Sequence, residues 1–166
     1  MNQQEPSRPA APFRPNLNGC VAKDLRLARA TEDCYQEELV SSAAYAYRSL
    51  LLENQDPILA DRMDDLAVED AEHFRMLGKL ILALGSDPSV RTRICVGGEI
   101  GRFSSPLAIP AEALRREQAQ IERLQTLLGK SADRVVRSLL SYILADHSRR
   151  IPFLEDWIRR QKNEMA

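Results

Sequence analysis

The segment Leu66–Pro88, LAVEDAEHFRMLGKLILALGSDP, decides the fold that we predict for this chain. Together with the residues just before it, the segment places apolar side chains at helical spacing, as the stripe of an amphipathic helix does: Met63, Leu66, Ala67, Phe74, Leu77, Ile81 and Leu84. The pattern ends where Gly85 can adopt the left-handed conformation of a helix C-cap, and Pro88 prevents its continuation. The segment therefore predicts one long helix with a buried face.

Two ionisable residues interrupt this apolar face. Asp70 and His73 are three positions apart, so they project from the same side of the helix. A carboxylate and an imidazole that point into a core are costly unless they are hydrogen-bonded, paired or bound to a metal ion. An acid-x-x-His pair in a long core helix is half of the pattern that builds di-metal sites in four-helix bundles, although the acid there is Glu.

The composition indicates one all-α domain. The 166 residues carry a net charge of −1, which gives no basic surface that would indicate a nucleic-acid partner. No signal peptide and no apolar run long enough to cross a bilayer is recognised, so we expect no membrane association. The cysteines Cys20, Cys34 and Cys95 are scattered and form no Cys-x-x-Cys pair. A reducing, cytoplasmic location is the simpler expectation.

The N-terminal residues 1–18 have a different composition from the rest of the chain. Prolines recur at every third position, at Pro6, Pro9, Pro12 and Pro15, and this spacing predicts an extended or disordered tail. A docking arm for a partner is the alternative interpretation. The remaining residues 19–162 are expected to form the folded domain.

Four helices are predicted in this domain, over residues 21–54, 57–84, 110–128 and 132–162. A second start inside the first helix, at Thr31, remains open. On that helix, Leu39, Ala43, Ala46 and Leu50 are core candidates. The short loop before Pro57 makes the first two helices antiparallel.

The connection between the second and third helices, residues 85–109, has no helical period and is long for a loop in a compact domain. It fits a long crossover between two helical hairpins. Gly129 is predicted as the C-cap of the third helix and Ser131 as the N-cap of the fourth. Pro152 predicts a kink in the fourth helix.

The two hairpins nearly repeat one polar pattern. Glu38 is followed by Asp70 and His73, and Glu117 is followed at similar spacing by His147 and Arg150. A di-metal bundle uses one Glu from each of two helices and a Glu-x-x-His pair from each of the others. Three of the six positions differ here, with Asp70 for Glu, His147 for Glu and Arg150 for His.

The region from about Leu25 to Trp157 resembles the ferritin-like superfamily, in particular rubrerythrin-like and bacterioferritin-like proteins. The resemblance is carried by EELVSSAAYAY, AVEDAEHFRMLGKLILALGSDP, EQAQI and ILADHSRRIPFLEDW. It implies a four-helix bundle of two antiparallel hairpins, a buried metal site, oxygen or peroxide chemistry or iron handling, and a homodimer. By the same resemblance, the metal-ligand candidates are Glu38, Asp70, His73, Glu117 and His147.

The altered positions predict a modified site. Arg150 is cationic at any working pH and cannot be an ordinary metal ligand. We hypothesise that Arg150 pairs with Glu117 and replaces the second metal ion. The donors Glu38, Asp70, His73 and His147 then suit one ion of Fe(II), Mn(II) or Zn(II).

Three function classes stay open on the sequence alone. The first is a rubrerythrin-like protein with one metal ion, linked to peroxide or oxygen chemistry or to metal handling. The second is a metal-free bundle with a buried polar network, acting as a structural or interaction protein. The third, a true di-metal oxidase or peroxidase, is the weakest because of Arg150.

The sequence identifies no electron donor. It leaves Tyr45 as a core aromatic or a residue near the metal, and we favour the core aromatic.

Overall fold

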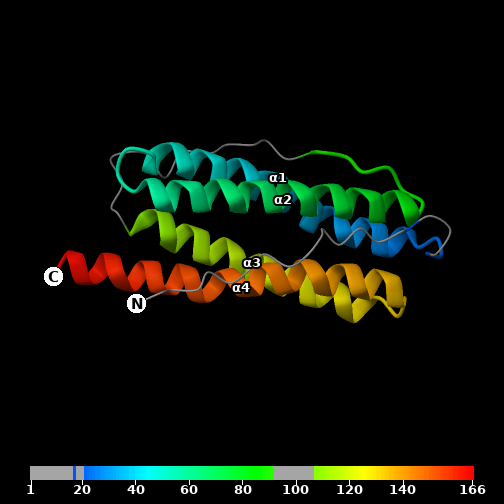
Figure 1. Ribbon diagram of the computed structural model, residues 1–166. Helices are drawn as coiled ribbons and strands as arrows, with labels where there is room; N and C mark the ends of the chain where they lie inside the picture. The colour runs from blue at the N-terminus through cyan, green and yellow to red at the C-terminus, as the bar shows by residue number, and fades with distance from the viewer. Residues whose placement is uncertain (1–16, 18–20, 92–106) are drawn as a thin grey trace.

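The protein was analysed as a computed structural model, which describes Leu17 and residues 21–91 and 107–166. Within these residues the chain forms four helices and no strand: α1 (Leu25–Leu52), α2 (Pro57–Ala83), α3 (Ala108–Lys130) and α4 (Arg134–Glu164). The hairpin α1–α2 packs beside the hairpin α3–α4 (Figure 1). The predicted all-α four-helix bundle is confirmed.

The direction of the helices requires a long crossover. α2 ends at one end of the bundle and α3 begins at the opposite end, so both run the same way (Figure 1). Most of the predicted crossover, residues 92–106, lies outside the described residues, as does the proline-rich tail except for Leu17. Of the predicted crossover 85–109, the last two residues already belong to α3.

Aspartates begin three of the helices. The carboxylate of Asp24 accepts hydrogen bonds from the backbone N–H groups of Arg26 and Leu27, and Asp56 does the same for Leu59 ahead of α2. Thr31 does not restart α1, because its hydroxyl donates to the Leu27 carbonyl within one continuous helix.

The turn between α3 and α4 differs from its prediction. Asp133, not Ser131, caps α4, because its carboxylate reaches the N–H groups of two residues in the first turn. Gly129 lies inside α3, and Ser131 ends that helix in an extended conformation. Gly85, by contrast, has the predicted left-handed φ of +95°. α4 runs through Pro152 without interruption.

The core consists of two apolar clusters, and the polar residues of interest lie between them along every helix. One cluster contains Leu77, Leu80, Ile81, Leu139, Leu140 and Ile143 among its members. The other contains Met63, Leu66, Leu154 and Trp157. Leu17 belongs to the first cluster at 6% exposure, so the tail predicted as disordered contributes at least this residue to the core.

The core face of α1 was predicted wrongly. Leu50 is 68% exposed and Ala46 is also exposed, whereas Val40, Ala44 and Tyr45 are buried. The reason is that α1 turns a mixed face inward, with Cys34, Glu38 and Ser41 on it, and a purely apolar stripe does not identify such a face.

None of the helices in the described residues has a stretch long and apolar enough to span a bilayer.

Candidate metal centre

The structure brings together all six polar positions of the sequence repeat at the middle of the bundle. α1 supplies Glu38, α2 supplies Asp70 and His73, α3 supplies Glu117, and α4 supplies His147 and Arg150. Each of these side chains is at most 2% exposed. Burial of so many ionisable groups is tolerated only where they pair with one another or bind an ion.

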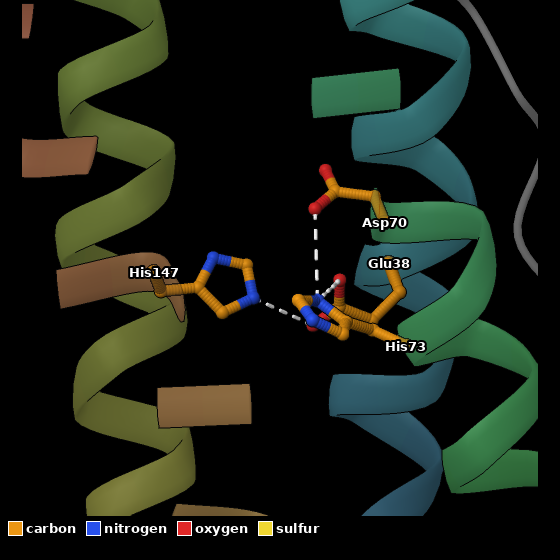
Figure 2. Close-up of side chains that lie close together, drawn as sticks. All are labelled: Glu38, Asp70, His73 and His147. Carbon is orange, nitrogen blue, oxygen red and sulfur yellow. Dashed lines mark hydrogen bonds and ion pairs between the residues drawn. The ribbon is translucent and has the colours of Figure 1, made fainter. Parts of the chain in front are cut away.

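Four of these residues converge on one point, and we call them the donor cluster: Glu38, Asp70, His73 and His147. Each offers one ligand atom, and these atoms all lie within 4.8 Å of one another. His147 approaches from the side opposite the other three (Figure 2). His73 Nδ1 lies 3.5 Å from Glu38 Oε2 and 3.8 Å from Asp70 Oδ1, and His147 Nε2 lies 2.9 Å from Glu38 Oε1. Two imidazole nitrogens and two carboxylates therefore face a common centre.

Asp146 fixes the orientation of His73. The Nε2 atom of His73 lies 3.0 Å from Asp146 Oδ2, a contact in which only the nitrogen can donate a proton. His73 Nδ1 is thereby directed at the carboxylates of the donor cluster. A histidine that donates to a carboxylate through one nitrogen and faces an ion through the other is the usual arrangement in metal sites. Sequence reasoning missed Asp146, although it directly precedes His147.

Several atoms of the donor cluster have no hydrogen-bond partner among the described residues. They are Glu38 Oε2, both Asp70 oxygens and His73 Nδ1, although Asp70 also forms an ion pair with Arg150. Buried polar atoms without a partner are rare in proteins and need a specific explanation. A cation at the common centre would satisfy atoms of all three residues at once, and the nitrogen and oxygen donors suit Fe(II), Mn(II) or Zn(II). The residues present therefore fit one divalent ion.

The six polar residues at the middle of the bundle form what we call the polar layer, and the donor cluster is one half of it. The guanidinium group of Arg150 occupies the other half. Arg150 Nη1 lies 2.6 Å from Asp70 Oδ1 and 3.1 Å from Glu117 Oε1, and its Nη2 lies 3.1 Å from Glu69 Oε2. Arg150 is 1% exposed. The pairing with Glu117 that the sequence suggested is present in the structure. Glu69 is an additional partner that sequence reasoning missed, although it directly precedes Asp70.

Glu117 lies beside the donor cluster but is not one of its four members. Its Oε1 accepts hydrogen bonds from Arg150 and from the Tyr45 hydroxyl, the latter at 2.5 Å, and its Oε2 lies 2.6 Å from His147 Nδ1. Both oxygens are therefore engaged. Tyr45 is buried and also belongs to this polar layer through its hydroxyl, so it is more than a packing residue.

Gln120 supports Glu38 from α3. Its side-chain amide donates to Glu38 Oε1 at 2.6 Å and to the Cys34 carbonyl at 3.2 Å. Sequence reasoning missed Gln120, which follows Glu117 by three positions and so shares its face. Burial, with a smaller contribution from Glu38, raises the pKa of the Cys34 thiol to about 12, so this cysteine stays protonated at neutral pH.

When no ion is bound, the neighbouring carboxylates raise the pKa of both histidines of the polar layer. Burial alone would lower the pKa of His147, but the carboxylates of Glu38 and Glu117 outweigh burial and raise this pKa to about 10. The pKa of His73 is also raised, because the hydrogen bond to Asp146 and the nearby carboxylate of Glu38 outweigh burial. Burial raises the pKa of Asp70 to about 6, against the opposing effect of Arg150. The imidazolium of His147 thus balances carboxylates in the metal-free protein.

This balance predicts that the metal-free protein loses stability as the pH rises above neutral. Histidine titrates near pH 6.5 in an unfolded chain, whereas folded His147 holds its proton to about pH 10. Its stabilising contribution is complete below pH 6.5 and declines as the pH rises toward 10, by at most about 1.4 kcal/mol per pH unit for each proton. Urea denaturation in excess chelator at pH 6.5, 7.5 and 8.5 measures the decline. His147→Gln should flatten it, and a wild-type stability that is constant over this range would contradict the prediction.

A four-helix bundle with carboxylates and imidazoles projecting into its centre is the architecture of carboxylate-bridged metal proteins. The family model described as Ferritin-like domain matches residues 30–163, and the chain belongs to this family. The predicted membership of the ferritin-like superfamily is confirmed. No curated protein matches the sequence.

Two solved bacterioferritins are similar in fold. The Desulfovibrio desulfuricans bacterioferritin, described by its diiron site, is 19% identical with a TM-score of 0.72, over 83% of this chain and 81% of that one. The Rhodobacter capsulatus bacterioferritin, described with a metal-free dinuclear site and heme iron, is 18% identical with a TM-score of 0.76, over 86% and 89% of the two chains. At these identities the similarity establishes the shared fold.

Proposed function

We propose that this protein binds one divalent metal ion per chain, Fe(II), Mn(II) or Zn(II), through Glu38, Asp70, His73 and His147. One observation carries the proposal: the buried Glu38 Oε2 and His73 Nδ1, which have no hydrogen-bond partner among the described residues, lie 3.5 Å apart at a centre to which Asp70 and His147 also contribute. Asp146 supports it further, because it directs a nitrogen of His73 at that centre.

Arg150 is the reason for one ion rather than two. Its guanidinium lies between Asp70 and Glu117 and supplies a fixed positive charge there. A second dication close to this charge would be repelled within a poorly screened interior. Glu117 completes the arrangement as a partner of Arg150 and His147 and not as a ligand of the ion.

The function that we assign to this site is peroxide or oxygen chemistry, or metal handling, of the rubrerythrin-like kind. A redox-active ion such as iron would supply electron transfer to such a substrate. The protein's own groups would orient the ligands, hold a proton on the Tyr45 hydroxyl that donates to Glu117, and exclude water through burial. A homodimer and a cytoplasmic location remain predictions of the same proposal.

A metal-free bundle with a structural or interaction role is the competing candidate. The observation that favours it is the internal charge pairing: Arg150 and protonated His147 oppose the buried carboxylates, and His73 contacts Asp146. Such a network can persist without an ion if most of its members are satisfied.

Metal stoichiometry separates the two candidates. Protein purified anaerobically, stripped with chelator and offered Fe(II), Mn(II) or Zn(II) in turn should retain about one ion per chain by elemental analysis. His73→Ala and Asp70→Asn should each lose it, since each removes a donor from the cluster. Glu72→Gln is the matched control, because Glu72 is a neighbouring acid of α2 outside the donor cluster, and it should bind like the wild type. Retention of no ion under any condition would refute the metal proposal and favour the metal-free bundle.

A further inference from the structure

A narrow recess between α1 and α3, with no room for a water molecule in this structure, borders the polar layer. Its inner end is lined by Glu38, Glu117 and His147, and its outer end by Glu37 and Arg116. The two outer side chains are 21% and 22% exposed, whereas the three inner residues are at most 1% exposed. The lining of the recess therefore runs from partly exposed side chains to residues of the donor cluster, and the recess is closed between them.

Arg116 lies across the outer end of this recess. Its Nη1 lies 2.9 Å from Glu37 Oε1 on α1, and its Nε lies 2.8 Å from Glu112 Oε1 on its own helix α3. One guanidinium thus ties the two helices together at the mouth. Two charge-assisted contacts of this kind hold the side chain in one orientation.

The position of Arg116 opposes the passage of a cation in two ways. Its side chain fills the mouth, and its positive charge repels an approaching dication. It also occupies the carboxylate of Glu37, which directly precedes Glu38 on α1. When Arg116 swings away, Glu37 keeps only a 3.9 Å contact of its Oε2 with Arg123 Nη1, and its Oε1 is left free at the mouth of a recess whose inner end holds the unpartnered Glu38 Oε2.

We propose that this recess is the entrance to the donor cluster and that Arg116 is the gate that limits how fast a divalent ion enters and leaves. The proposal rests on the metal-binding function proposed above. In it, Glu37 captures the ion at the open mouth and passes it to Glu38. The gate acts on rates and leaves the affinity of the donor cluster nearly unchanged, because Arg116 touches none of the four donors in the described structure.

Stopped-flow loading with Co²⁺ tests the gate. Co²⁺ in a site of mixed nitrogen and oxygen donors gives visible absorbance, so association with the apoprotein and release to a chelator are both measurable. Arg116→Ala should raise both rates about tenfold and change the equilibrium Kd by less than threefold. Arg115→Ala is the matched control: it removes the same charge and one partner of Glu112, but Arg115 is 68% exposed and does not line the recess. Its rates should stay within twofold of the wild type.

The outcomes distinguish the gate from the metal site. Equal loading rates in Arg116→Ala and the wild type, with His73-dependent binding intact, would overturn the gate alone. An equal rise in Arg115→Ala would also overturn it, because the effect would then be one of surface charge. Absence of His73-dependent Co²⁺ binding at equilibrium in both the wild type and Arg116→Ala would overturn the proposed function and the gate together.

Discussion

Arg150→Met should destabilise the metal-free protein by about 3–5 kcal/mol, the magnitude typical of removing one partner from a buried ion pair. Methionine roughly preserves the volume, so the loss reports charge more than packing. The variant leaves Asp70 and Glu117, both at most 1% exposed, without their guanidinium partner. Urea denaturation at pH 8 in excess chelator is the measurement.

Arg149→Met is the matched control for Arg150→Met. Arg149 is the preceding residue on α4, but its side chain is 57% exposed, and its partner Asp146 also contacts His73. Because the charge of Arg149 is largely solvated and Asp146 keeps His73 as a partner, this variant should lose much less stability than Arg150→Met. If Arg150→Met cost no more than Arg149→Met, the guanidinium would not be the compensating charge of the polar layer.

Saturating Mn(II) should recover part of the stability that Arg150→Met loses. A dication bound by the donor cluster places positive charge beside Asp70, and any ligand that binds only the folded state stabilises it. The metal-free bundle predicts no such recovery. The same pair of denaturation curves therefore also bears on the choice between the two candidate functions.

The sequence was sufficient for the helices and for the six polar positions because both are local, periodic signals. The buried stripe of α2 and the Asp56–Pro57 start depend on residues within a few turns of one another. The inward direction of Glu38, Glu117 and His147 followed from matching spacings in the two hairpins. Such signals do not require knowledge of how the helices are rotated against each other.

The missed residues depend on that rotation. Asp146 reaches His73 from 73 positions away, Gln120 reaches Glu38 from 82 away, and Arg150 reaches Glu69 from 81 away. Asp146 and Glu69 each directly precede a predicted site residue, and only the packing of the two hairpins decides whether they turn inward. Gln120 shares the face of Glu117, but its contact with Glu38 again depends on that packing. Leu50 is the opposite case: it was predicted to be buried because it is apolar, but the rotation of α1 leaves it exposed.

The double substitution His147→Glu with Arg150→His should raise the metal content from about one to about two ions per chain. It gives α4 the Glu-x-x-His pair that each of two helices contributes in di-metal bundles. It removes the guanidinium that lies between Asp70 and Glu117, and it frees Glu117 Oε1 and Oε2 from Arg150 and His147. Glu38 and Glu117 then stand as one carboxylate from each of α1 and α3, while α2 keeps Asp70 and His73.

Elemental analysis after anaerobic Fe(II) loading measures this change, with the single variant Arg150→His as its control. The single variant removes the fixed charge but adds no bridging carboxylate, so it should remain near one ion, because two cations about 3.5–4 Å apart require bridging negative charge. Two ions in the single variant would mean that the guanidinium alone excludes the second ion. One ion in the folded double variant would mean that the shorter Asp70 is what prevents a pair, and that Arg150 fills a space which this protein could not use for metal.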